Sequence, residues 1–360
     1  MTILFRDASS ESQDSTVIDN VDYLDAFDFS SVNAYKNRLQ SRNPDHPFNN
    51  LANEEFLVKV RAIEYKNNKY HPTLAGLLMF GKTSEILKQL PHFFLEYINY
   101  GNSHNRWDDR VVYDGTWGEG NIFNFLTIVM PKLLNTAQNR FSLEDDGVTR
   151  KGYSDIQLAL REAFINSLIH ADYRIEDRIQ IKYVNNDYIF TNPGSLRISV
   201  EEFYNGRRSK PRNPNIALMF RIIGLAEEAG SGVETILKAA NSNNLPKPQI
   251  DISNNKVSLR IETTPLVDYL TKKFSLDKRE YDVLKAIHDG TALRRTEIQE
   301  LTGYSRGIVL NVVNSMLKKG IISQIGKSSA TKYIISEDHI NSKERTINTL
   351  ERMISIIQNN

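Results

Sequence analysis

The chain has 360 residues, of which 40% are hydrophobic and 25% charged, and its formal net charge is +1. This composition is typical of soluble globular proteins, and the length allows two or three domains. The absence of cysteine excludes disulfide frameworks, thiolate zinc sites and cysteine nucleophiles. A net charge near zero excludes a general attraction to nucleic acid, so any such attraction has to be local. Without a membrane-length apolar run or a signal-peptide core, we expect a cytoplasmic protein.

Acidic residues dominate the beginning of the chain. Residues 1–30 contain seven Asp and Glu against a single basic residue, Arg6, and the stretch ASSESQDST is rich in serine. We therefore expect an acidic flexible arm over residues 1–30. Residues 31–145 should form an α/β region that precedes and packs on the following core. Within it, SVNAYKNRLQSR predicts a helix, HFFLEYINYG and DRVVYDGTW predict strands, and NIFNFLTIVMPKLLNTAQN predicts a helix kinked at Pro131.

Residues 76–83, GLLMFGKT, match the P-loop pattern G-x-x-x-x-G-K-[ST]. A P-loop requires a strand before it, a helix after the lysine and a backbone that can approach phosphate. Here the four middle residues are apolar, and the preceding HPT is typical of a helix start, with Pro72 in the first turn and Thr73 or His71 near the cap. We therefore interpret the segment as a buried helix that ends at Gly81, and we do not expect nucleotide there.

The segment from 146 to 262 mixes helices and strands. SDIQLALREAFINSLIHADY predicts a long helix, and RIQIKYVNNDYIFTNPG predicts a hairpin that turns at Asn185-Asn186-Asp187. NPNIALMFRIIGLAEEAGSGVETILKAANSN predicts two helices interrupted at glycines, and PKPQIDISNNKVSLRIET predicts a second hairpin. The fold class expected from this mixture is α+β, or layered α/β.

Residues 275–337 change in character. DKREYDVLKAIHDG, RRTEIQELTG and YSRGIVLNVVNSMLKKG predict three helices, and IISQIG and TKYIIS predict two strands. This order is the layout of a winged helix-turn-helix domain. Residues 301–336 contain no Asp or Glu, which suits contact with DNA phosphates, although a winged helix used only for protein contact is the alternative. The candidate DNA-binding residues are Ser305, Arg306, Asn311, Lys318, Lys327 and Lys332.

A C-terminal helix is expected over residues 338–360. Its apolar residues follow a spacing of three, four and three, which makes a short a/d stripe: Ile347, Leu350, Ile354 and Ile357. The stripe is too short to hold a dimer alone. It either packs back on the winged helix or forms part of a larger interface. Because DNA half-sites are usually read by two-fold dimers, we expect a homodimer.

The central helix carries Glu162 and Asn166 four residues apart, so they lie on one face. Such a pair alone has almost no predictive value. It is followed, however, by a strand, by Asn192-Pro193-Gly194, by a basic segment, and by Gly230-Ser231-Gly232 at a helix start. The series of motifs, in this order, is what makes the pattern specific.

This series resembles the Bergerat-fold, GHKL-type ATPase superfamily, which includes DNA gyrase B subunits, histidine kinases and MutL. More closely, residues 70–240 resemble bacterial RecG-related or Schlafen-related transcriptional regulators, in which a segment similar to HPTLAGLLMFGK precedes the ATPase-like domain. The resemblance implies a Bergerat-type ATP-binding domain over residues 146–262. Two features depart from those families. No segment resembles their usual N-terminal AlbA-type domain, so we interpret the chain as a shortened member or a fragment. The adenine motif Asp-x-Gly-x-Gly is replaced by Asn192-Pro193-Gly194, without a second glycine.

The resemblance implies ATP and Mg²⁺ as cofactors and assigns roles. Asn166 would ligate Mg²⁺, and Glu162 would orient or deprotonate the attacking water. Asn192 and Gly194 would line the adenine pocket. Phosphate oxygens would bind at Gly230, Ser231 and Gly232.

Two further groups of residues leave alternatives open. The run Arg207, Arg208, Lys210 and Arg212 is either a lid or phosphate clamp, or a solvated or DNA-facing loop. His170 and Asp172 are either metal ligands or residues that bond the backbone at a helix end.

The function expected from these patterns is an ATP-binding, DNA-binding transcriptional regulator, in which nucleotide state modulates a winged-helix dimer. One alternative is a degenerate ATPase-like scaffold or ligand sensor without turnover. Another is an ATPase that acts on nucleic acid in a defence system. The sequence leaves open whether ATP is hydrolysed, and it contains no helicase motor motifs.

Overall fold

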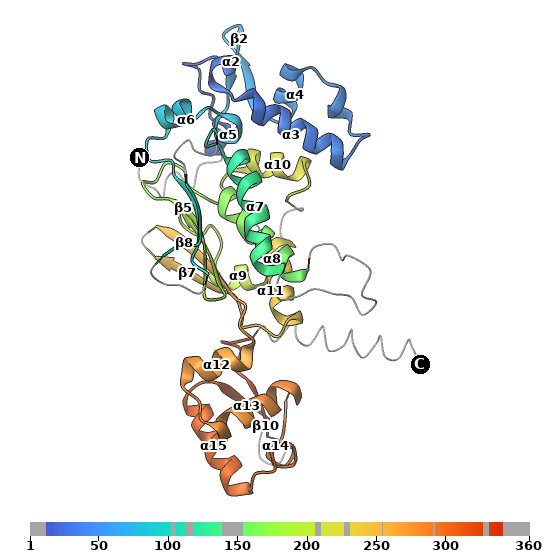
Figure 1. Cartoon of the computed structure of the whole chain (residues 1–360), viewed down its shortest axis with the longest axis vertical. Coiled ribbons are helices and arrows are strands. Elements are labelled where there is room, and N and C mark those ends of the chain that lie inside the picture. Colours follow the sequence, from blue (N-terminus) through green and yellow to red (C-terminus); the bar gives the residue numbers. More distant parts are fainter. Residues whose placement is uncertain are drawn as a thin grey trace. The chain divides into compact units, whose positions relative to one another are not determined.

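The computed structural model describes residues 12–101, 106–112, 118–138, 154–205, 210–226, 231–253, 255–290, 292–326 and 331–340. The chain divides into two compact units (Figure 1). The first comprises Met1–Ile236 with Gln249–Arg260, and the second Leu237–Pro248 with Ile261–Asn360. In the described part of the chain, no helix is long and apolar enough to cross a membrane.

The N-terminal region is mainly helical around an aromatic core. Tyr35 is fully buried, and its ring centroid lies 5.2 Å from that of Phe80 and 5.6 Å from that of Phe123. A two-stranded antiparallel hairpin also belongs to this region. The elements are η1 (Gln13–Ser15), α2 (Tyr23–Ala26), α3 (Phe29–Arg42), η2 (Pro47–Asn50), α4 (Asn53–Lys59), β1 (Ile63–Lys66), β2 (Lys69–Pro72), α5 (Leu74–Phe80) and α6 (Thr83–Gln89).

Residues 12–30 belong to this fold, which corrects the predicted flexible arm; residues 1–11 lie outside the described residues. Asp14 is fully buried. Asp22 and Asp28 cap α2 and α3, because their carboxylates accept hydrogen bonds from backbone N–H groups of the first helical turn. The backbone N–H of Ile18 donates to the carbonyl oxygen of Pro72 at 2.8 Å. The carboxylates of Asp22 and Asp28 therefore stabilise helix N-termini within the fold.

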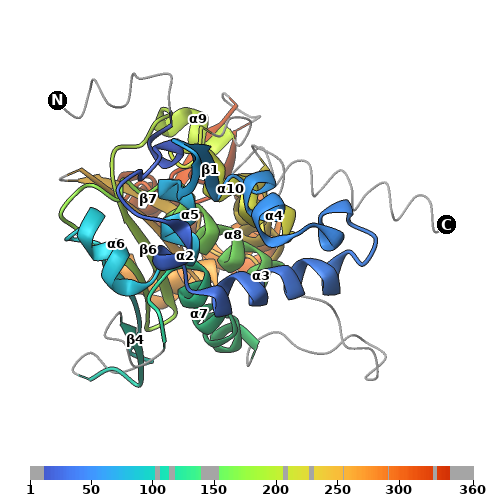
Figure 2. The same cartoon turned by 90° about the horizontal axis from the view of Figure 1, so that it is seen from above.

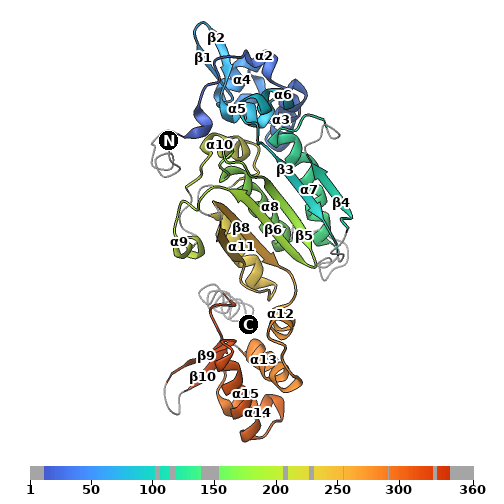
Figure 3. The same ribbon diagram turned by 90° about the vertical axis from the view of Figure 1, so that its left-hand side faces the viewer.

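A six-stranded mixed sheet follows in the order β4-β3-β5-β6-β8-β7 (Figure 3). Strands β3 and β5 are parallel, whereas β3–β4, β5–β6 and β7–β8 pair antiparallel. The β5–β6 hairpin turns at Asn185 and Asn186, whose φ values of 49° and 73° are left-handed and suit asparagine. Both predicted hairpins are confirmed. The strands are β3 (Leu95–Asn99), β4 (Asp109–Val112), β5 (Ile179–Val184), β6 (Asp187–Pro193), β7 (Gln249–Ser253) and β8 (Lys256–Glu262).

Two long helices, α7 and α8, pack against each other and against the sheet (Figure 1). Their contact includes Phe125 and Phe164, whose ring centroids lie 5.8 Å apart. Helix α7 continues through the predicted kink residue Pro131. Three shorter helices each contribute residues to the candidate site. The helices are α7 (Ile122–Gln138), α8 (Asp155–Ile169), α9 (Val200–Asn205), α10 (Pro214–Ile222) and α11 (Ser231–Ser242).

The second unit has its own core, in which Leu284, Val313 and Ile335 are fully buried. The three predicted helices and the two predicted strands are confirmed, and a further helix, α12, precedes them. The second and third helices are followed by Gly303 and Gly320 with φ values of 71° and 70°. The elements are α12 (Leu266–Phe274), α13 (Lys278–Gly290), α14 (Arg295–Thr302), α15 (Arg306–Lys318), β9 (Ile322–Ile325) and β10 (Lys332–Ile335).

Candidate functional site

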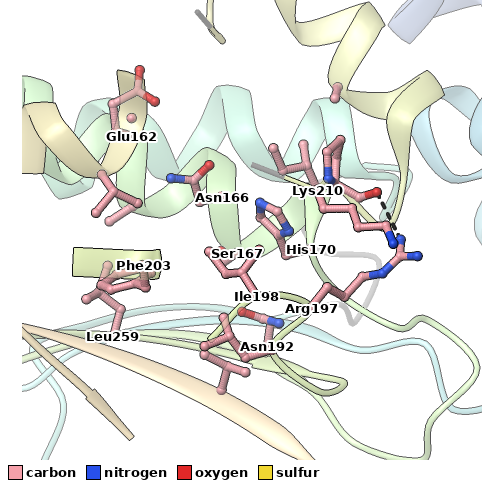
Figure 4. Close-up of a pocket in the computed structure, with 18 of the residues that line it drawn as sticks. Glu162, Asn166, Ser167, His170, Asn192, Arg197, Ile198, Phe203, Lys210 and Leu259 are labelled. Carbon is pink, nitrogen blue, oxygen red and sulfur yellow. Dashed lines mark hydrogen bonds between the residues drawn. The ribbon is translucent and has the colours of Figure 1, made fainter. Parts of the chain in front are cut away.

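Helix α8 presents the predicted acid and amide on one face. The helix begins at a capping box: the Ser154 hydroxyl accepts from the N–H of Gln157, and the Gln157 side chain accepts from the N–H of Ser154. Glu162, Asn166 and His170 follow at intervals of four residues, and all three line one cavity (Figure 4). The expectation that Glu162 and Asn166 share a face is confirmed.

The cavity lies between α8, α10, the start of α11 and strands β6 to β8, and its volume is about 250 Å³. Most of the wall is apolar, and a few polar groups, among them Asn166 and Asn192, point into it (Figure 4). An apolar wall with a few convergent polar groups is typical of small-molecule sites, whose volumes run from about 300 to 1,000 Å³. The cavity is therefore close to the size of such a site.

The start of α11 lies directly against Glu162 and Asn166. A Cβ atom at Gly232 would lie 2.8 Å from Glu162 Oε2 and 3.2 Å from Asn166 Nδ2. Glycine at this position therefore lets the helix terminus come close to both side chains. The N-terminal turn of α11 brings backbone N–H groups and the positive end of the helix dipole to this part of the cavity. Gly230 and the side chain of Ser231 lie outside the described residues, so their phosphate contacts stay predictions.

These donors fit a nucleotide with Mg²⁺. A helix N-terminus suits phosphate, and Mg²⁺ takes oxygen ligands such as the amide oxygen of Asn166 while it keeps phosphate and water ligands. Within the described ranges, no group of three or more His, Cys, Asp or Glu side chains could hold a metal ion. A metal here would therefore depend on ligands beyond the protein, as a phosphate-bound Mg²⁺ does.

Asn192 and Gly194, predicted for the adenine pocket, lie at the end of β6 and just after it. Asn192 is buried, lines the cavity, and donates a hydrogen bond from its amide to the carbonyl oxygen of Pro193 at 3.3 Å. Gly194 has a φ of +109°, which L side chains rarely adopt, and its N–H donates to Asn255. Gly194 therefore shapes the turn, and Asn192 contributes to the polar part of the cavity lining.

Arg212, predicted as a phosphate-binding residue, is placed differently. It is only 3% exposed, and its guanidinium donates to the carbonyl oxygens of His170 at 3.3 Å and of Ser195 at 3.0 Å. These contacts direct Arg212 to the loop backbone, outside the cavity lining. We therefore assign it to the structure of the loop. From the same basic run, Lys210 lines the cavity, and residues 207 and 208 lie outside the described residues.

His170 and Asp172 have different environments. Burial, with added repulsion from Arg212 and Arg197, lowers the pKa of His170 to about 4, so the ring that lines the cavity is neutral at pH 7. Asp172 is 1% exposed, and its carboxylate accepts from the backbone N–H of Arg174 at 3.1 Å. Of the two roles considered for Asp172, a metal ligand or a residue that bonds the backbone at a helix end, this contact corresponds to the second.

Sequence reasoning missed two cations that line the cavity, Arg197 and Arg221. The guanidinium of Arg197 donates to the carbonyl oxygen of Pro211 at 3.2 Å (Figure 4). Arg221 lies on α10 and is exposed. Neither residue belongs to a recognisable motif, since the loop and the helix come together only in the fold. With Lys210, they make part of the cavity wall positive.

Two regions of the chain match family models. Residues 176–261 match the model described as "Putative ATP-dependent DNA helicase recG C-terminal", and residues 2–96 match a domain of unknown function, DUF8451. The crystal structure of the DIP2311 protein from Corynebacterium diphtheriae aligns with a TM-score of 0.56 at 19% identity. That alignment covers 93% of this chain but 66% of the DIP2311 chain, and at this identity it shows a shared fold alone. No curated protein matches the chain.

The P-loop-like segment 76–83 lies within the DUF8451 match. Its first five residues belong to the buried helix α5, which ends at Gly81 as interpreted from the sequence, and Thr83 begins α6. A Cβ atom at Gly76 would overlap the carbonyl oxygen of Ala62, so this glycine serves close packing. Lys82 donates from its ammonium to the carbonyl oxygen of Asp25 at 2.9 Å. The N–H of Thr83 donates to the Glu119 carboxylate at 2.6 Å. The groups that would hold phosphate in a P-loop are thus bound to the protein itself.

The candidate DNA-binding residues lie in the second unit. Ser305 precedes α15 as its N-cap and is exposed, as are Arg306, Asn311 and Lys318 on the helix. Val309 and Val313 of the same helix are buried in the core. Lys332 begins β10 and is partly exposed, and residue 327 lies outside the described residues. The neighbouring Lys319 differs from these, because its ammonium contacts both carboxylate oxygens of Glu280, at 2.7 and 2.8 Å.

Proposed function

We propose that the chain is an ATP-binding, DNA-binding transcriptional regulator in which nucleotide state modulates a winged-helix dimer. The observation that carries the nucleotide part is the approach of Gly232, at the start of α11, to Glu162 and Asn166 of α8. An anion-binding helix terminus, a carboxylate and an amide therefore meet at one end of an apolar cavity. The match of residues 176–261 to a family named for an ATP-dependent helicase supports the same ligand.

Each polar group has a role in this proposal. Asn166 supplies an amide oxygen to Mg²⁺, which neutralises phosphate charge when bound. Glu162 orients or deprotonates the attacking water if ATP is hydrolysed. The amide of Asn192 hydrogen-bonds the edge of the adenine. Gly230, Ser231 and Gly232 receive phosphate oxygens through their N–H groups.

The DNA part of the proposal rests on the second unit. Helices α13 to α15 and the hairpin β9–β10 have the order of a winged helix-turn-helix domain, with α15 as recognition helix. The outward side chains of α15 include Arg306 and Lys318, and residues 301–336 contain no acid that would repel phosphate. This charge distribution supports DNA as the partner over a purely protein contact.

Isothermal titration calorimetry with ATP and Mg²⁺ tests the nucleotide part. We expect the wild type to bind and Asn166→Ala to bind at least about tenfold more weakly, because a metal ligand is lost. Lys82→Ala is the control and should bind as the wild type does, since its ammonium is bonded to Asp25. Glu162→Gln should bind normally but lose any turnover. No heat from the wild type at millimolar nucleotide would refute ATP binding.

A second candidate is a ligand sensor without turnover, and the apolar cavity wall and the missing second glycine after Gly194 favour it. A sensor of this kind would prefer a ligand with little charge. Thermal unfolding with ATP, ADP and adenosine separates the two functions. A melting temperature that rises with ATP and Mg²⁺ favours the nucleotide regulator, whereas a rise with adenosine alone favours the sensor.

A further inference from the structure

Helix α10 lies beside the helices of the N-terminal region (Figures 2 and 3). The same helix also lines the cavity. Its residues divide into two sets at helical spacing, so each set occupies its own face. The set that lines the cavity is Pro214, Ala217, Leu218 and Arg221. The set that is buried away from the cavity is Asn215, Ile216, Met219 and Phe220. A shift of this helix would therefore change the cavity and its contacts with the N-terminal region together.

Asp14 holds the start of α10. The side chain is fully buried, and its Oδ2 accepts hydrogen bonds from the N–H groups of Asn215 at 2.8 Å and Ile216 at 3.0 Å. Its other oxygen accepts from the Ser12 hydroxyl at 2.8 Å. A carboxylate at this place satisfies the free N–H groups of the first turn and interacts favourably with the helix dipole. Asp14 is thus a helix cap supplied from another part of the chain.

The start of α10 has a second bond, and helix α3 holds its middle and end. The guanidinium of Arg61 donates to the side-chain oxygen of Asn215 at 3.1 Å. The hydroxyl of Tyr35 donates to the carbonyl oxygen of Met219 at 2.7 Å, and neither residue is exposed. Gly224, just after the helix, has a φ of +67°, and a Cβ atom there would overlap the guanidinium of Arg42. Contacts from the N-terminal region therefore follow the whole length of α10.

We infer that Asp14 is a positioning residue for the cavity, and that the N-terminal region and ligand binding are coupled through α10. The inference rests on the proposed function in so far as ATP with Mg²⁺ is the ligand. Without the Asp14 carboxylate, the first N–H groups of α10 would be buried without an acceptor, so the helix start would fray or shift. The cavity residues Pro214 and Ala217 would move with it. By linkage, a ligand that requires α10 in place stabilises the docked N-terminal region by the same factor.

Calorimetry on the full chain tests the coupling. We expect Asp14→Ala to weaken ATP binding by about tenfold, which corresponds to the penalty for unsatisfied buried N–H groups. Asp14→Asn keeps one acceptor oxygen and should be intermediate; it also serves if Asp14→Ala does not fold. The matched control is Asp22→Ala. Asp22 caps α2 by accepting from the N–H of Leu24, and α2 supplies none of the described lining residues, so ATP affinity should stay within about twofold.

Hydrogen exchange without nucleotide distinguishes this inference from the proposed function. In Asp14→Ala, amides in 214–222 should exchange at least about tenfold faster, whereas those in 155–169 should not change. If the wild type binds ATP and Asp14→Ala binds equally well, the inference is overturned and the proposed function stands. If the wild type does not bind ATP, the proposed function fails, and hydrogen exchange in residues 214–222 then tests the positioning role of Asp14 by itself. Unchanged exchange there overturns the positioning role.

Discussion

Gly232 lies so close to Glu162 that a Cβ atom on the glycine would be 2.8 Å from the carboxylate oxygen. The glycine is the second residue of α11, and Glu162, which is 3% exposed, projects from the middle of α8. Both residues line the same cavity. Two motifs that are far apart in the sequence therefore meet at one point, and changes at this point should affect ligand binding first.

Gly232→Ala should weaken ATP binding by about tenfold. The new methyl group would displace the Glu162 carboxylate and the Asn166 amide, and overpacking of this kind costs about 1–3 kcal/mol. Calorimetry gives the affinity, and urea denaturation shows that the protein remains folded. Gly307→Ala is the control, because a Cβ atom there meets nothing within 4 Å, and it should leave ATP affinity unchanged. Wild-type affinity in Gly232→Ala would show that the close approach has no part in ligand binding.

Two adjacent lysines of the second unit should behave differently. Lys318 is exposed, so Lys318→Ala should weaken DNA binding uniformly across sequences and reduce the salt slope by about one, with little change in stability. Lys319 pairs with the buried Glu280, so Lys319→Ala should lower the unfolding free energy by about 1–3 kcal/mol. Gel shifts at several salt concentrations and urea denaturation measure the two effects. Equal DNA binding by Lys318→Ala and the wild type would remove this residue from the interface.

Reversing charge on the recognition helix and wing should abolish DNA binding. The double variant Arg306→Glu, Lys327→Glu places negative charge where phosphate contact is proposed. A gel shift at low salt measures the effect. An unchanged shift would move the DNA-contact surface, and the basic run 207–212 would be the next region to test.

The stability of the protein should depend on pH through His170. Its pKa is lowered to about 4 in the folded chain, against a usual value near 6.5. Between pH 4 and 6.5 the unfolded chain binds more protons than the folded chain, so the unfolding free energy rises with pH. Above pH 6.5 the contribution of His170 to stability is fully present. His170→Gln should flatten this rise, by up to about 3 kcal/mol. Urea denaturation at pH 4.5 and 7 measures it, with the exposed His92→Gln as control.

The C-terminal a/d stripe lies outside the described residues, and its role in a homodimer stays a prediction. Light scattering on the full chain and on a chain that ends at Ser336 tests it. We expect a dimer for the full chain and a weaker or absent dimer for the shortened one, because apolar contact area is lost. Two monomers at micromolar concentration, with and without ATP, would refute the dimer. Two dimers would place the interface elsewhere.

The sequence by itself determined the local elements and the shared face of the central motif. The Ser154–Gln157 capping box and the Asn185–Asn186 turn act over four residues or fewer, so their signals are complete within a short segment. The helical period likewise places Glu162 and Asn166 on one side without reference to the rest of the fold.

Only the tertiary structure decided which charged residues meet the cavity and which hold the fold together. Asp14 reads as part of a solvated acidic arm, yet it is buried against Asn215, 201 residues away. Arg212 stands in a basic run that suggests phosphate, but it bonds loop carbonyl oxygens, while Arg197 and Arg221 line the cavity. Composition and spacing show where charged residues lie along the chain, but they do not show which groups each charged side chain contacts. A buried charge needs compensating groups, and the tertiary fold determines which groups lie close enough to supply them.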